Sequence, residues 1–102
     1  MSFGIFGKIS AVEGKRDQLS EILLTAAKAL QSMKECEIYM VNINDEEPNS
    51  IWVTEVWKDE EAHKASLSNE EVRNLIMKGR SLITGMERLN TFEVLGGKGL
   101  TK

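Results

Sequence analysis

The sequence predicts an α+β domain whose elements follow the order β-α-β-β-α-β. This is the ferredoxin-like arrangement of a four-stranded antiparallel sheet with helices on one face. Apolar residues alternate with a period of two in four short segments, they recur at three- and four-residue steps in longer ones, and an acidic turn joins the second and third strand segments. The chain has 102 residues, of which 41% are apolar and one is proline, and this size fits one domain.

The first strand and the first helix are predicted in the N-terminal third. Residues 3–11 place Phe3, Ile5 and Ile9 on one side of an extended chain. A turn closed by Gly14 follows. Apolar residues then recur at helical spacing and predict an amphipathic helix with one buried stripe. The stripe consists of Leu19, Ile22, Leu23, Ala26, Leu30 and Met33.

A hairpin is predicted in the middle of the chain. Residues 35–44 are rich in β-branched and aromatic side chains, and the acidic segment DEEPNS at 45–50 contains turn-forming residues. The segment IWVTEVW at 51–57 then provides the third strand. These two strands are therefore expected to pair with each other in antiparallel orientation.

The second helical region is predicted in two pieces. Asp59 is expected to cap a short helix at its N-terminus. Ser68 and Glu71 have the spacing of a capping box and are expected to open another helix. Its apolar residues continue to Ile83, and Gly85 is expected to end it, as a glycine just past a helix commonly does.

The last strand is predicted at residues 86–95, where strand-forming residues return. The segment GGKGLTK at 96–102 is rich in glycine and is expected to be a flexible tail. The predicted domain therefore comprises residues 1–95.

Composition argues against several classes of function. Thirteen basic and sixteen acidic residues give a formal net charge of -3, and no basic run is interleaved with aromatics, so nucleic acid is not an expected partner. Cys36 is the only cysteine, which leaves no intrachain disulfide and no zinc site. Neither a signal peptide nor a membrane span is apparent. We therefore expect a cytoplasmic protein with no membrane partner, no metal and no cofactor.

Four segments resemble the antibiotic biosynthesis monooxygenase (ABM) domains, a family of dimeric α+β barrels. They are GK at 14–15, TEVWKDEEA at 54–62, LSNEEVRNLI at 67–76 and NTFEVL at 90–95, and the resemblance spans about residues 3–95. It implies a homodimer whose sheets pack into a barrel. For some members it also implies a cofactor-independent oxidation of quinols or polyketide phenols by molecular oxygen.

Two departures from the family pattern bear on the reaction. Many ABM domains have a histidine four positions after the alanine that corresponds to Ala62. This chain has Ser66 there, so His63 is only a neighbour of the family's histidine position. The haem-degrading relatives place asparagine, tryptophan and histidine where this chain has Gly7, Ser66 and Ile76. Haem degradation is therefore not expected.

Three residues are candidates for catalysis: His63, Trp57 and Arg80. His63 would act as a general base, while a surface histidine among charged neighbours is the simpler alternative. Trp57 would line a pocket between the sheet and the helices, or would only fill the core at the strand-to-helix corner. Arg80 would stabilise a phenolate or superoxide by its charge, or would only flank an apolar stripe.

Five residues are candidates for substrate binding, namely Tyr39, Asn42, Trp52, Ser66 and Ile76. Tyr39 and Asn42 belong to the second strand and could hydrogen-bond a phenolic substrate, while a strand tyrosine that reaches solvent is the common alternative. Trp52 has the opposite parity from Trp57, so one of these rings is expected to face the helices and the other the dimer barrel. Ser66 and Ile76 occupy positions where the resemblance to the ABM family and its haem-degrading relatives places functional residues.

The sequence leads to two hypotheses of different class. The first is a cofactor-independent monooxygenase that oxidises a small aromatic molecule or quinol with molecular oxygen, in an apolar cavity with one or two polar groups. The alternative is a non-catalytic dimeric domain that binds or senses a small ligand. A homodimer is expected in both cases. The predicted strands have large apolar residues on both faces, and the helices can cover only one.

Overall fold

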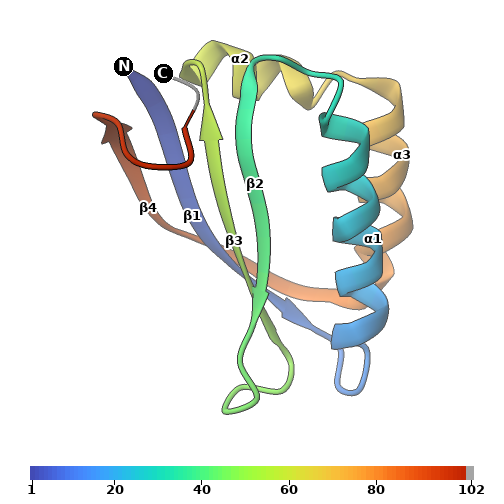
Figure 1. Ribbon diagram of the computed structural model, residues 1–102. Helices are drawn as coiled ribbons and strands as arrows, with labels where there is room; N and C mark the ends of the chain where they lie inside the picture. The colour runs from blue at the N-terminus through green and yellow to red at the C-terminus, as the bar shows by residue number, and fades with distance from the viewer. Residues whose placement is uncertain (101–102) are drawn as a thin grey trace.

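The computed structural model describes residues 1–100, and Figure 1 shows one sheet with helices packed on one of its faces. The strands are β1 (Ser2–Ala11), β2 (Cys36–Ile43), β3 (Ser50–Trp57) and β4 (Ile83–Val94). The helices are α1 (Arg16–Leu30), α2 (Glu60–Ser66), α3 (Glu70–Gly79) and the short 3₁₀ helix η1 (Arg80–Leu82). The strand order is β2-β3-β1-β4, and each neighbouring pair is antiparallel. The predicted α+β ferredoxin-like fold is confirmed.

The two faces of the sheet differ in what covers them. The face called the helix face below carries α1 and α3, and its β1 and β3 side chains include Ile5, Ile9, Ile51 and Val53, all buried. The other face, called the open face below, has no helix on it in Figure 1. Because side chains alternate along a strand, each residue of a strand can be assigned to one of these faces from its register.

Helices α1 and α3 lie side by side on the helix face (Figure 1). Leu19 of α1 belongs to the same core cluster as Ile9 and Ile51. A Cβ atom on Gly79 would lie 3.2 Å from Cδ1 of Leu19 and 3.7 Å from Cγ2 of Ile22. Glycine at the end of α3 therefore allows the two helices to approach each other closely.

The predicted end of the second helical region is wrong. Helix α3 ends at Gly79, η1 follows, and Gly85 lies inside β4 opposite Ser10. Leu82 and Ile83 do pack against the core, but they do so from η1 and from the first residue of β4. Two adjacent apolar residues fit a helical and an extended period equally, so the sequence pattern alone could not separate the two.

The helix caps agree with the prediction at one position and differ at another. Asp59 caps α2 as expected, because its Oδ1 accepts a hydrogen bond from the Ala62 N–H at 2.7 Å. The cap of α3 is Asn69 and not Ser68, since Asn69 Oδ1 accepts from the Val72 N–H at 3.1 Å. Both caps satisfy a backbone donor that the first turn leaves free.

A bulge interrupts the pairing of β4 with β1. Phe6 lies opposite Asn90 and Gly7 lies opposite Arg88, so Leu89 is an extra residue on the β4 side. An extra residue reverses the facing of the strand beyond it. Arg88 therefore points to the helix face.

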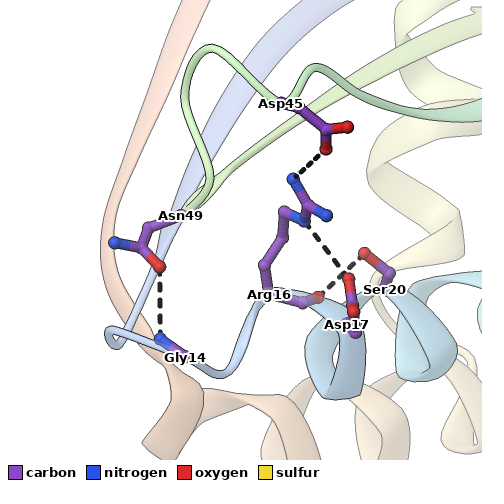
Figure 2. A network of polar contacts seen from close by, with 6 residues as sticks. All are labelled: Gly14, Arg16, Asp17, Ser20, Asp45 and Asn49. Atoms are coloured by element: carbon purple, nitrogen blue, oxygen red, sulfur yellow. Dashed lines mark hydrogen bonds and ion pairs between the residues drawn. The ribbon is translucent and has the colours of Figure 1, made fainter.

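A polar network joins the β2–β3 loop to the start of α1, and Figure 2 shows it. Gly14, whose φ of 79° is in the left-handed region, donates its N–H to Asn49 Oδ1 at 3.2 Å. Arg16 pairs with Asp45 at 3.3 Å and with Asp17 at 3.2 Å. The network links the loop to the start of α1 at the end of the sheet opposite α2 (Figure 1).

Beyond β4, residues 95–100 form neither strand nor helix. The predicted flexible tail includes residues 101 and 102, which lie outside the described residues, and its flexibility stays a prediction. Among residues 1–100, no helix has the length and apolar character needed to cross a membrane.

Candidate active site between the sheet and the helices

Glu55 lies on the helix face in the middle of β3, between the buried side chains of Val53 and Trp57. Its side chain is only 17% exposed. Its Oε1 accepts a hydrogen bond from Trp57 Nε1 at 2.9 Å and lies 3.9 Å from Nε2 of His63. A carboxylate among core residues is costly unless it has such partners. This position therefore brings three polar or aromatic groups together.

His63 reaches this group from α2. Its side chain is 12% exposed, so the alternative of a surface histidine does not describe it. The imidazole stands edge-on to Trp57, with ring centroids 5.6 Å apart at 69°, and lies 6.4 Å from the ring of Phe3. The cap at Asp59 fixes the start of the helix that carries it.

The surroundings of His63 favour its neutral form. Burial lowers the pKa of His63 below its ordinary value of 6.5, and Arg88 lowers it further, while the carboxylates of Glu55 and Glu60 act in the opposite direction. The net pKa is lowered, so the imidazole is neutral at pH 7. A neutral imidazole can accept a proton, as a general base must.

Strand β2 contributes two groups that keep their protons. Tyr39 lies directly opposite Glu55 in the sheet, and burial together with that carboxylate raises the pKa of the phenol. Burial, with Glu55 and Glu37 adding to it, raises the pKa of the Cys36 thiol to about 11. Tyr39 therefore remains a hydrogen-bond donor at neutral pH, and Cys36 is not an activated nucleophile.

Strand β4 adds Arg88 and Thr91 to the helix face, opposite Gly7 and Ile5 of β1. Neither Arg88 nor Glu55 is among the site residues that the sequence predicts. Glu55 has a signal in the sequence, because it shares the parity of Ile51 and Trp57 in a strand whose other members of that parity are apolar. Arg88 has no such signal, since only the bulge at Leu89 turns it to this face.

The predicted residues divide between the two faces. His63, Trp57 and Tyr39 come together on the helix side. Asn42 and Trp52 lie opposite each other on the open face, where Asn42 Nδ2 donates to the Trp52 carbonyl at 3.1 Å. These two residues therefore do not line a pocket between the sheet and the helices.

The other predicted residues do not present free groups to this cluster. Ser66 is buried, and its hydroxyl donates to the His63 carbonyl at 2.6 Å in the last turn of α2. Ile76 is about half exposed on α3. Arg80 lies in η1, beyond the ten residues of α3, which separate it from α2 by a helix of about 15 Å.

A hollow of about 370 Å³ opens beside the cluster, where β1 begins, β4 ends and α2 begins. Its lining includes Phe3, Asp59, Glu60, Thr91, Phe92 and Glu93. Phe3 also packs against His63, so the hollow and the cluster share one aromatic wall. The volume is in the range of small-molecule sites, about 300–1,000 Å³.

The chain matches the profile of a known protein family. The family profile described as antibiotic biosynthesis monooxygenase matches residues 2–77. The chain belongs to the ABM family. The matched range of this ABM domain contains Tyr39, Glu55, Trp57 and His63, and it ends before Arg88. None of the curated protein sequences compared with the chain matches it significantly.

Several solved structures share the fold of this ABM domain. A proposed antibiotic biosynthesis monooxygenase from Chloroflexus aurantiacus is 39% identical, with a TM-score of 0.89 over 98% of this chain and 99% of the other. One from Deinococcus radiodurans is 22% identical, with a TM-score of 0.78 over 95% of each chain. A variant of SnoaB, a cofactor-independent oxygenase from Streptomyces nogalater, is 14% identical, with a TM-score of 0.78 over 95% of this chain and 96% of the other. The last two show a shared fold only.

Proposed function

We propose that this ABM domain oxygenates a small electron-rich aromatic, such as a quinol, with molecular oxygen and without a cofactor. The observation that carries the proposal is the neutral, largely buried imidazole of His63, placed among aromatic rings beside an open hollow. Family membership supports the reaction type. A base that takes the phenolic proton is what this chemistry requires of the protein, because the substrate itself supplies the electrons.

The reaction balances without an external reductant. His63 takes the proton of a phenolic hydroxyl, and the resulting anion donates electrons to oxygen. One oxygen atom becomes a hydroxyl group in place of a ring hydrogen, and the other leaves as water with the two hydrogens that the quinol gives up, among them the proton held by His63. A quinol and one O₂ thus give a hydroxyquinone and one water, with all four electrons coming from the substrate.

The neighbouring groups have separate roles in this proposal. Tyr39 donates a hydrogen bond and Arg88 supplies positive charge to the anion that forms. Arg88 thereby takes the role that the sequence alone had given to Arg80. Trp57 is only 1% exposed, so it supports the site from behind and does not stack on the substrate. Phe3 lines the hollow, and its ring centroid lies 6.4 Å from that of His63.

The proposal includes a homodimer formed through the open face. Met40 and Phe92 are large apolar residues on that face, and each is about half exposed. Such exposure over a sheet surface is typical of an interaction site. Two sheets packed through these faces would cover these residues and add core to a small domain.

Oxygen consumption tests the proposed reaction. Purified protein is given a panel of quinols and hydroxylated aromatics in an oxygen electrode, and the products are analysed by mass spectrometry after reaction with ¹⁸O₂. We expect one labelled oxygen atom in the product, and a loss of about 100-fold or more in rate for His63→Ala. Glu61→Gln, an exposed carboxylate on the same helix, is the matched control and should keep the rate. Uptake no faster than autoxidation with every substrate would refute the proposal.

A ligand-binding domain without turnover is the second candidate. It is favoured by the way the buried polar groups satisfy one another, since the Trp57 indole bonds Glu55 and the Ser66 hydroxyl bonds a backbone carbonyl. In that case native mass spectrometry of freshly purified protein should find a bound aromatic molecule. This molecule should be recovered chemically unchanged after oxygen is supplied. Conversion of such a ligand would favour the oxygenase.

A further inference from the structure

We propose that Glu55 is a positioning residue, which holds His63 with its proton on Nε2 so that Nδ1 receives the proton of the substrate. This inference deepens the proposed function and rests on it.

Placing the carboxylate of Glu55 among core residues costs desolvation free energy, and a residue with a structural role alone would not need this charge. Val53 and Trp57, the neighbours of Glu55 on the helix face of β3, are both apolar. The side chain of Glu55 is 17% exposed. Valine or threonine would suit this strand position without any desolvation of charge. A carboxylate in such a place is retained only if its partners compensate for the lost water.

Trp57 fixes the carboxylate. The indole Nε1–H has no acceptor capacity, and it donates to Glu55 Oε1 at 2.9 Å. Trp57 is fully buried, and its ring is held by the core residues Ile5, Leu30 and Val72. The oxygen atom therefore has a defined position relative to the sheet.

The same oxygen atom is the one nearest to His63. Glu55 Oε1 lies 3.9 Å from Nε2 of the imidazole, beyond hydrogen-bond range but within that of an ion pair. A carboxylate that only accepts favours the tautomer with a proton on the facing nitrogen. Nδ1 then keeps its lone pair. Once Nδ1 is protonated, the imidazolium pairs with the carboxylate, and the contact is expected to shorten.

The charges around His63 make Glu55 the natural counterion. Glu60 on α2 and Arg88 on β4 are the other charged groups that act on the imidazole. On β2, Tyr39 lies opposite Glu55 and Cys36 lies opposite Trp57, and both keep their protons. The positive charge of Arg88 disfavours protonation of the imidazole, and the negative charge of Glu60 favours it. Of the two carboxylates, Glu55 has the greater influence on His63.

Because His63 is the only histidine, its imidazole can be observed by NMR without assignment. The ¹⁵N shifts of the wild-type ring at high pH report the tautomer directly and require no mutation. We expect Nε2 to carry the proton. A ring protonated on Nδ1 would overturn the inference, whether or not any variant folds.

A pH titration of the same ¹⁵N signals of His63 is the second test. Glu55→Gln keeps the size of the side chain and an oxygen that can accept from Trp57, but it removes the charge. We expect it to lower the pKa of His63 by about 1 unit, while Glu61→Gln leaves this pKa unchanged. An unchanged pKa in folded Glu55→Gln would also overturn the inference.

Kinetics connect the pair to the reaction. Glu55→Gln should reduce kcat by about 10- to 100-fold with little change in KM, and should move the acid limb of the pH profile to lower pH. Glu55→Asp, which restores the charge, should bring the acid limb back toward that of the wild type. If no quinol is oxidised by the wild type, the oxygenase proposal fails, while the NMR arms still decide the Glu55–His63 pairing.

Discussion

At the scale of single residues, burial decides the chemistry of His63. The imidazole is removed from water by the rings of Phe3 and Trp57, and the carboxylate of Glu55 compensates only in part. The net result is a histidine whose pKa lies below 6.5. The direction matters for catalysis, because a base must be unprotonated at the working pH.

The lowered pKa also links stability to pH. In the folded state His63 binds a proton less tightly than it does in the unfolded chain, where its ordinary pKa is 6.5. The stabilisation from its neutral form is therefore present above 6.5 and is lost as the pH falls through 6.5 toward the folded pKa. We expect wild-type protein to lose more unfolding free energy than His63→Gln when the pH is lowered from about 7.5 to about 5.5.

Urea unfolding of both proteins at the two pH values measures this difference. The carboxylates are common to the two proteins, so their contributions cancel in the comparison. An equal loss in both would mean that His63 titrates alike in the folded and unfolded chain.

At the scale of elements, α1 shows how one face of a helix carries most of its stabilisation. Leu19 is 1% exposed in the core beneath the helix, whereas Leu24 on the same helix is 44% exposed. We expect Leu19→Ala to destabilise the fold by about 2–5 kcal/mol, because it removes buried methyl groups and leaves a cavity.

Leu24→Ala is the matched control, since it makes the same chemical change on the same helix. Its cost should stay below about 1 kcal/mol, because the side chain is partly in water in both states. Chemical denaturation of the two variants gives both values. Similar losses would mean that Leu24 is covered in solution, for instance by another subunit.

The elements were largely predictable from the sequence, and the site only in part. The order of strands and helices follows from two periodicities that differ clearly over eight or more residues. The segment around Leu82 and Ile83 was too short for that distinction. Glu55 could have been found from its parity in β3. Arg88 could not, because its facing depends on how β4 pairs with β1 at the bulge, which is a property of two strands together.

At the scale of the whole molecule, the open face predicts association. Met40 and Phe92 are exposed on a sheet surface that carries no helix in Figure 1. Light scattering coupled to size exclusion at low micromolar concentration should give twice the chain mass. Met40→Glu should reduce this mass toward that of one chain, because it would place a charge in the buried interface.

Met77→Glu is the control for this variant. Met77 is an exposed methionine on α3, away from the open face, so the same substitution there should leave the dimer intact. A wild-type protein that remains folded and monomeric would refute association through the sheet.

The short length of α2 has a consequence for the whole site. A helix of seven residues is far below the length at which a helix is stable by itself in water, about 12–15 residues, so α2 persists only through its cap and its packing on the sheet. We therefore expect His63 to belong to a segment that opens locally while the rest of the domain stays folded. For a ligand bound beside His63 as proposed, part of the free energy of binding would keep this segment closed, and affinity for the ligand and order in α2 would rise and fall together.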